Sequence, residues 1–350
     1  MYFTEEVVIK KIVKAAVLLA AVAVLSAAAA VVLFRYFNTP QESSVTGKAV
    51  VFSVVPGDTV GSIADRLFEK RLIKSSAALR LYSRIMGSSG SFKIGSYRIE
   101  YGEKMNEIHD ILIEGHQILY KVTIPEGWTF KRIGELLEEE GITNTSDFYK
   151  AVSDRELLSG LGIEADNAEG FLFPDTYLFQ KDFPAERTVS FMIKNFFKNL
   201  DMIYPGYSAL SFNELYQKII LASIVEREYR IAEEAPLIAG VFYNRLKNSM
   251  SLGSCATIAY IITDVEDKAH PSRITYDDLE IQSPYNTYIN KGLPPGPIAN
   301  PGKTALEAAF HPADTKYMFF VLEDPVTGRH KFTETYRDHL TAKNLYIKTK

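Results

Sequence analysis

Glu226 is the residue of this chain best placed to do acid chemistry. It continues a stripe of apolar side chains that recur at helical spacings of four, three and four residues, namely Leu215, Ile219 and Ala222. A carboxylate beside an apolar wall is poorly hydrated, which raises its pKa and lets it act as a general acid near neutral pH. The alternative is a solvated helix residue that pairs with Arg230, four positions on. The pattern alone leaves both interpretations open.

Glu228 is not expected to share this task. It lies two positions beyond Glu226, a rotation of about 200° around a helix, so the two carboxylates cannot both face one bound substrate. The sequence also lacks a serine three residues before a lysine, a nucleophile elbow, a zinc-binding histidine pair and a phosphate-cradling glycine loop. We therefore expect catalysis by a lone carboxylate, with no metal and no cofactor.

The helix that carries Glu226 and its neighbours can be outlined from local signals. Ser211 and Glu214 form a capping box that starts this helix. A second helix is expected over residues 233–246, with Pro236 in its first turn. Residues 283–302 contain five prolines and three glycines, so we expect a rigid irregular loop there. A hairpin within residues 317–333 and a helix over 334–346 should follow.

Two similar stretches precede these elements. Each reads as a strand, a Pro/Gly turn, a helix begun by a threonine and a second turn, and the two threonines are Thr59 and Thr129. A linking helix should follow the second copy, near residues 146–158. Together these elements predict an α+β fold.

The N-terminal segment predicts a membrane anchor. Lys10, Lys11 and Lys14 precede an uncharged apolar run over residues 15–34, which is long enough to span a bilayer as a helix. The basic side should stay in the cytoplasm, so everything after Arg35 is expected outside. A cleaved signal peptide is the alternative, because residues 27–30 are small enough for a peptidase.

Composition excludes several classes of site. A net charge of −4 and a pI near 6.0 give no electrostatic reason to expect nucleic-acid binding by these 350 residues. Cys255 is the single cysteine, so an internal disulfide and a cysteine-rich zinc site are impossible. We expect it to be a buried, inert thiol.

The first strand-helix copy resembles the opening of a LysM glycan-binding module, in the residues VVPGDTVGSIA at 54–64. A packing unit without strong sugar affinity is the alternative, because the motif also builds a turn and a helix cap. We thus expect a cytoplasmic tail (1–14), a transmembrane helix (15–36), a linker (37–48), a LysM-like domain (49–118) and a catalytic domain (119–350). The catalytic domain would begin with the second LysM-like unit, at about 119–160.

Five short motifs follow one another along the chain: EGFLFPDTY (169–177), ASIVERE (222–228), VFYNRL (241–246), YNTY (285–288) and GLPPGPI (292–298). In these motifs and their order, the chain resembles the MltG/YceG-like endolytic murein transglycosylases of bacteria. Two places depart from the family pattern. CATI at 255–258 stands where Asp-Pro-Thr-Val is common, and Leu340 stands where an asparagine is expected after Tyr336 and His339.

The resemblance implies a membrane-anchored lytic transglycosylase that cleaves peptidoglycan glycan strands between MurNAc and GlcNAc without water. Glu226 would protonate the leaving oxygen, then accept the proton of the muramic acid C6 hydroxyl as that oxygen closes on C1, leaving a 1,6-anhydro end. It also implies endolytic cleavage that ends strand elongation, in the bacterial cytoplasmic membrane, with peptidoglycan synthases as expected partners. Substrate-binding side chains are expected from these motifs: Asp175, Ser223, Glu228, Asn244, Arg245, Tyr285, Asn286, Thr287 and Tyr288.

Three points stay open at this stage. The loop after residue 285 is expected to line the glycan cleft, with Asn286 bonding to the sugar and the tyrosines stacking on it, unless the loop only covers the core. A muramidase-type hydrolase would need a second inward carboxylate, for which Glu169 or Asp175 is the best candidate. A non-catalytic wall-binding scaffold would leave Glu226 with a structural role.

Overall fold

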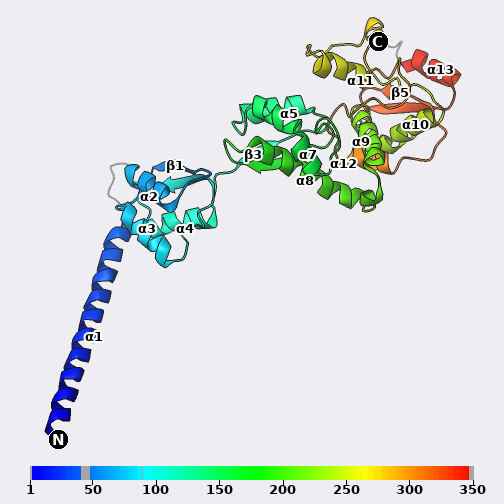
Figure 1. Ribbon diagram of the computed structural model, residues 1–350. Coiled ribbons are helices and arrows are strands. Elements are labelled where there is room, and N and C mark those ends of the chain that lie inside the picture. Colours follow the sequence, from blue (N-terminus) through cyan, green and yellow to red (C-terminus); the bar gives the residue numbers. More distant parts are fainter. Residues whose placement is uncertain (1, 41–47, 89, 347–350) are drawn as a thin grey trace. The chain divides into compact units, whose positions relative to one another are not determined.

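The computed structural model of the protein describes residues 2–40, 48–88 and 90–346. The chain divides into two compact units, Met1–Leu119 and Tyr120–Lys350 (Figure 1). The expected linker over residues 37–48 falls mostly on residues 41–47, which lie outside the described residues.

The first unit begins with one long apolar helix, α1 (Tyr2–Asn38). Its segment Val13–Asn38 has 26 residues, a mean hydropathy of 2.8 and exposed side chains in its apolar stretch. Such a helix is long enough to cross a bilayer, and a signal sequence has the same character. The expected apolar N-terminal helix is therefore confirmed, while its fate in the cell stays a prediction.

The rest of the first unit is a small sheet with helices packed on it. Its elements are β1 (Ala49–Val54), α2 (Val60–Glu69), α3 (Ser76–Ile85), β2 (Gly95–Glu100) and α4 (Met105–Glu114). The two strands pair antiparallel, with Ala49 opposite Glu100. Thr59 starts α2 as expected, because its hydroxyl accepts the Ser62 amide at 3.1 Å. Glycan binding by this unit stays a prediction.

The second unit opens with the second copy of this arrangement. Its elements are β3 (Tyr120–Thr123), α5 (Phe130–Glu139) and α6 (Thr145–Val152), and β3 pairs antiparallel with β4 (Thr176–Phe179). The internal repeat is thus confirmed. The prediction of a single linking helix near residues 146–158 is wrong. Asp154 accepts the amides of Glu156 and Leu157 and so starts a new helix, α7 (Arg155–Gly160).

The remaining elements of the second unit include the helix that carries Glu226. They are α8 (Ala185–Ile203), α9 (Phe212–Glu226), α10 (Ala235–Lys247), α11 (Cys255–Tyr260), α12 (Lys303–Phe310), β5 (Phe319–Asp324), β6 (Arg329–Thr333) and α13 (Tyr336–Tyr346). Short 3-10 turns lie at Tyr207–Ala209, Ala232–Glu234 and Asp277–Glu280, and a π turn, Ile261–Val265, continues α11. The expected second helix, hairpin and closing helix are all confirmed.

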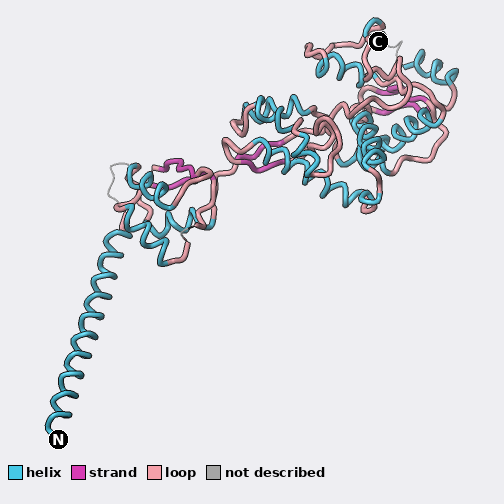
Figure 2. The backbone as a smooth tube through the Cα atoms, in the orientation of Figure 1, coloured by secondary structure: helices cyan, strands magenta, loops and turns pink. Residues whose placement is uncertain are grey.

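α9 is the centre of this second unit. It packs on α12 and α10, and these helices gather near the β5–β6 hairpin (Figure 1). Residues 219–225 are buried without exception, which is why this helix has no polar face in its C-terminal half. Between α11 and α12 the backbone is almost entirely irregular, as Figure 2 shows and as the proline content predicts. This loop returns the chain to the end of α9.

Candidate active site

The sequence of α9 sets both ends of the helix. Ser211 N donates to Glu214 Oε2 at 2.8 Å, and Glu214 N donates to Ser211 Oγ at 3.3 Å, so the expected capping box is present. The helix then runs for 15 residues and ends at Glu226. The apolar stripe that leads to Glu226 is buried as predicted, at Leu215, Ile219 and Ala222.

The solvated, ion-paired alternative for Glu226 is wrong. Because α9 ends at Glu226, Arg230 lies beyond the helix, where it is exposed, and no ion pair joins the two in the part of the chain that the structure describes. The carboxylate is instead held from inside the protein. Its Oε2 accepts Gly302 N at 2.9 Å, and its Oε1 accepts the Tyr229 hydroxyl at 3.4 Å.

Burial raises the pKa of Glu226 to about 7. The Gly302 amide and Arg227 oppose this rise by stabilising the charged form, whereas the negative charge of Glu126 adds to it. Protonated and ionised forms are therefore both well populated at neutral pH. A carboxyl group in this state can donate a proton in one step and accept one in the next.

Glu126 is a site residue that the sequence reasoning missed. It belongs to the Pro-Glu-Gly turn between β3 and α5, and the Tyr229 hydroxyl lies 3.5 Å from Glu126 Oε2 as well as 3.4 Å from Glu226 Oε1. The two copies of the repeat differ here, since the first has Gly57-Asp58 where the second has Glu126-Gly127-Trp128. That extra residue was the available signal.

Two glycines, Gly302 and Gly127, leave room for the side chains of Glu126 and Glu226. A Cβ on Gly302 would lie 1.9 Å from Glu126 Oε1, and a Cβ on Gly127 would lie 3.5 Å from Glu226 Cγ. Gly127 also has a φ of +73°, which a residue with a side chain rarely adopts. Any side chain at position 302 would displace Glu126 and disturb the hydrogen bond from the Gly302 amide to Glu226.

Glu228 faces a different environment from Glu226, although not for the reason expected. It lies in the turn after α9, so the helical rotation does not apply to it. Its carboxylate accepts the Ser254 hydroxyl, and the charges of His330 and Arg245 are close enough to favour its ionised form. The pKa of Glu228 is nevertheless raised, because burial outweighs these contacts.

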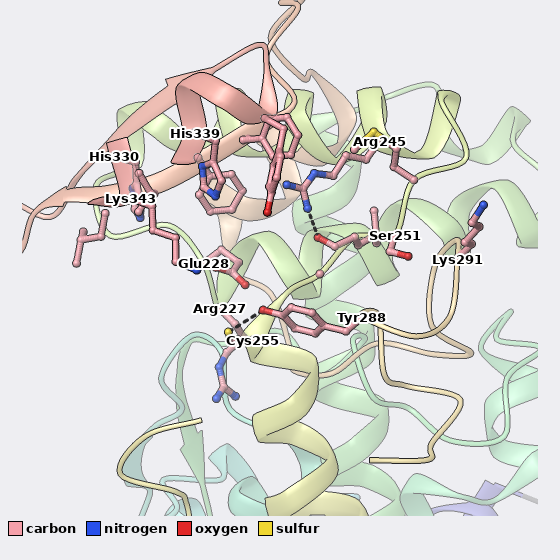
Figure 3. Close-up of a pocket in the computed structure, with 18 of the residues that line it drawn as sticks. Arg227, Glu228, Arg245, Ser251, Cys255, Tyr288, Lys291, His330, His339 and Lys343 are labelled. Atoms are coloured by element: carbon pink, nitrogen blue, oxygen red, sulfur yellow. Dashed lines mark hydrogen bonds between the residues drawn. The ribbon is translucent and has the colours of Figure 1, made fainter. Parts of the chain in front are cut away.

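Arg227, the residue that follows Glu226, lines two cavities. The first has a volume of about 850 Å³, and we call it the basic pocket; its polar lining includes Arg227, Glu228, Arg230, Arg245, Lys291 and Lys343 (Figure 3). The second, of about 210 Å³, we call the Trp128 pocket; it is lined by Gly127, Trp128, Arg132, Arg227, Asp264 and His270. Arg227 lines both cavities and directly follows Glu226, which is not itself among the lining residues of either one.

Three of the expected substrate-binding residues line the basic pocket: Glu228, Arg245 and Tyr288. In Figure 3 they approach it from the turn after α9, from α10 and from the long loop. The Arg245 guanidinium is oriented by backbone carbonyls, since Nε donates to Met318 O at 2.7 Å and Nη1 to Leu252 O at 2.6 Å.

Three others are buried inside the protein. Ser223 Oγ accepts Ile298 N at 3.0 Å and so ties the proline-rich loop to α9, and Thr287 Oγ1 accepts Ser254 N at 3.0 Å. The Asn286 side chain is fully buried, with Nδ2 bonded to two carbonyls of the preceding turn and Oδ1 to the Tyr288 amide. The expected direct contact of Asn286 with a sugar is therefore wrong, because these bonds use its amide to hold the loop.

The last three expected residues serve other contacts. Asn244 Nδ2 donates to the carbonyls of Thr315 and Tyr317 at 2.8 and 2.9 Å, which fixes the chain before β5. Tyr285 packs its ring against Tyr260, with centroids 5.1 Å apart. Asp175 is exposed and lines a separate hollow. Neither Asn244 nor Asp175 is brought to Glu226 by a contact that the structure describes.

Asn300 joins the loop, the repeat and the core. Its side chain accepts the amides of Gly170 and Leu172, both at 2.9 Å, and donates to Trp128 O at 2.9 Å and to Glu169 Oε1 at 2.7 Å. Glu169 in turn accepts Phe130 N at 3.1 Å and thereby caps α5, and burial raises its pKa well above the usual range. Glu169 is thus a structural carboxylate, and it is not the second inward acid that a hydrolase would need.

Cys255 does not have the expected environment. It is exposed at the start of α11, where its Sγ lies 3.0 Å from the Tyr288 hydroxyl (Figure 3). The expectation of a buried thiol is therefore wrong, because the first turn of this short helix borders the basic pocket. Within residues 2–40, 48–88 and 90–346 no three His, Cys, Asp or Glu side chains are grouped as metal ligands.

Comparisons with known proteins agree on one family. A sequence model of the YceG-like family matches residues 52–345. A Bacillus subtilis protein named endolytic murein transglycosylase is 32% identical over 317 residues, 86% of each chain. A Streptococcus pneumoniae (strain R6) protein of the same name is 28% identical, over 83% of this chain and 57% of its own length. The 2.6 Å crystal structure of a yceG-like protein from Listeria monocytogenes matches with a TM-score of 0.55 and 28% identity, covering 84% of this chain and 99% of that one.

Proposed function

The chain belongs to the YceG-like family, and on that premise we propose that it is a lytic transglycosylase that cleaves the glycan strands of peptidoglycan. The observation that carries the proposal is the state of Glu226. This carboxyl group has a pKa near 7, is held by the Gly302 amide and belongs to the residue that directly precedes Arg227, which lines two cavities. The relatives named endolytic murein transglycosylase and the chemistry of Glu226 both support transglycosylase activity.

The reaction needs one proton carrier. Protonated Glu226 gives its proton to the glycosidic oxygen as the bond from MurNAc C1 to that oxygen breaks. The C6 hydroxyl oxygen of the same MurNAc then bonds to C1, and its proton passes to the Glu226 carboxylate. The products are a free GlcNAc hydroxyl and a 1,6-anhydroMurNAc end, and no water is consumed. A pKa near 7 suits both proton transfers, because neither form of the acid is strongly disfavoured at working pH.

Muramidase-type hydrolysis is the second candidate, and one observation favours it. Glu126 adds a second carboxylate that contacts the same Tyr229 hydroxyl as Glu226. Ordinary glycosidases use two carboxylates, one of which activates water or forms a covalent intermediate. The lytic reaction remains the primary proposal, since Glu126 is exposed, whereas Glu226 is partly buried and has a raised pKa.

Mass spectrometry of the products separates these possibilities. Purified glycan strands incubated with the full chain in detergent should gain 1,6-anhydroMurNAc ends, and the Glu226→Gln protein should form far fewer. New reducing MurNAc ends would instead establish hydrolysis. A folded protein that binds strands and yields no new ends would overturn both enzymatic proposals and favour a wall-binding scaffold.

We further propose that α1 is retained as a single-pass anchor in the cytoplasmic membrane, with the second unit outside the cytoplasm. Its apolar segment continues past the small residues at 27–30, to Asn38. Cleavage within growing strands, with peptidoglycan synthases as neighbours in the membrane, would follow from this location. Protease added after the outer surface of the membrane is exposed should remove a C-terminal tag. A protected tag, or a mature protein that starts near residue 30, would contradict this topology.

A further inference from the structure

The basic pocket is a site whose chemistry the cleavage reaction does not use. Five cationic side chains line it, Arg227, Arg230, Arg245, Lys291 and Lys343, and Glu228 is the only acidic one. In the described part of the chain none of these five has a carboxylate within ion-pair distance. This local excess of positive charge occurs in a chain whose net charge is −4.

The positive charge also affects a neighbouring histidine. Burial, together with the charges of Arg245 and Lys343, lowers the pKa of His339. The field at this wall of the pocket thus disfavours adding another positive charge. A pocket in this electrostatic state favours a bound anion, whose entry would relieve repulsion among fixed cations.

Part of the remaining lining is apolar. Met250, Leu252 and Phe319 to Leu322 contribute side chains to the same pocket. A ligand that consisted only of phosphate would leave this surface unused. A ligand with carboxylates spaced along short aliphatic side chains would contact both the cationic and the apolar side chains of the pocket.

The position of the pocket limits what that ligand is attached to. Arg227 and Glu228 follow Glu226 directly and line the pocket, so a glycan bound at Glu226 would carry substituents within reach of this opening. The sugar backbone of peptidoglycan is uncharged, but each MurNAc bears a peptide on its lactyl group, with several carboxylates and alanine methyl groups. That peptide matches the pocket in charge and in hydrophobicity.

We propose that the basic pocket binds the carboxylates of the stem peptide on a MurNAc residue next to the cleaved bond. The inference rests on the proposed function for its substrate and goes beyond it, because it makes the enzyme selective for strands that carry their peptides. Lys291 and Lys343 come from the long loop and from α13, so they would clasp the peptide from two sides.

Peptide-free strands provide the test. The rate constant kcat/KM is measured on uncrosslinked strands with intact peptides and on the same strands after an amidase has removed them. Wild-type protein should prefer intact strands. A Lys291→Ala/Lys343→Ala protein should lose about tenfold in that preference, mainly through KM, as expected for two lost charge contacts. The preference of the wild type should also weaken as salt is raised.

A matched control removes the same charge elsewhere. Lys247 and Lys316 are exposed in the same unit and do not line the pocket, so Lys247→Ala/Lys316→Ala should keep the wild-type preference. If the pocket variant lowers kcat/KM equally on both substrates, or the control variant does the same as the pocket variant, the proposal is overturned.

A binding measurement keeps this test independent of catalysis. Calorimetry with a muramoyl tetrapeptide and the full-length Glu226→Gln protein in detergent should give heat that is lost in the triple variant with Lys291→Ala and Lys343→Ala. Equal binding of the peptide by both proteins would refute peptide binding by the basic pocket, even if the wild type cleaves the strands. Peptide binding without any cleavage by the wild type would instead refute the proposed function alone.

Discussion

Replacing Glu226 by glutamine tests both the chemistry and the electrostatics of this site. Glutamine keeps the size of the side chain and an acceptor for the Gly302 amide, but it cannot donate the acid proton. Loss of a general acid-base group lowers turnover by about 10²-fold to 10⁴-fold, so formation of anhydro ends should fall at least into that range. The fold should survive, because no packing is lost.

The same substitution should stabilise the protein in a pH-dependent way. The pKa of Glu226 rises from 4.5 to about 7 on folding, and each unit corresponds to ~1.4 kcal/mol. For an acid with a raised folded-state pKa, stability is fully present below the unfolded pKa of 4.5 and is lost as pH rises through 7. Wild type therefore loses about 3 kcal/mol that the glutamine variant keeps.

Urea unfolding at two pH values measures this difference. Above pH 8 the Glu226→Gln protein should unfold with a higher free energy than wild type by up to about 3 kcal/mol, and near pH 4.5 the two should nearly coincide. Glu233→Gln, at an exposed position, is the control and should show no such pH-dependent gain. If the gain at high pH is absent, the carboxylate is not desolvated as described. If anhydro ends still form at near the wild-type rate, Glu226 is not the proton carrier.

Three further substitutions probe the surroundings of this carboxylate. Glu126→Gln removes a charge that raises the pKa of Glu226, so the alkaline limb of the kcat/KM profile should move to lower pH; an unmoved limb would argue against their coupling. Glu228→Gln should reduce the cleavage of purified strands much less than Glu226→Gln, and an equal loss would place it in the chemistry. Asn300→Ala breaks four buried hydrogen bonds and should lower the unfolding free energy by roughly 2–4 kcal/mol in urea titrations; a smaller loss with normal activity would mean that water replaces the amide.

Features set by neighbouring residues were predictable from the sequence. The capping box at Ser211 and the apolar stripe that ends at Glu226 depend on contacts within one helix, and the structure has both. The repeat was visible for the same reason. The splitting of the helix near residues 146–158 was predictable in principle, because Asp154 is a favourable N-cap, but the apolar pattern runs through it.

Contacts across long sequence distances were not predictable. Gly302 and Glu126 reach Glu226 over separations of 76 and 100 residues, and nothing local marks either as a partner. Asn286 could not be assigned for another reason. An asparagine side chain can bond to a sugar or hold an internal turn, and the packing of the loop decides which of these two roles it has. Cys255 was misjudged because exposure at the first turn of a helix depends on the neighbouring cavity.

The bonds around Asn300 make the second strand-helix copy inseparable from the catalytic core. Asn300 bonds to Trp128 through its backbone and its side chain, and its carbonyl accepts Gly127 N at 2.9 Å. Residues that look like a detachable module in the sequence are therefore part of one cooperative folding unit with α12. A truncated protein that starts after residue 160 would lose Glu126 and α5, and would leave Asn300 and Glu169 without their partners at Trp128 and Phe130. The second copy therefore belongs to the same compact unit as the candidate active site, whereas the first copy belongs to the other unit.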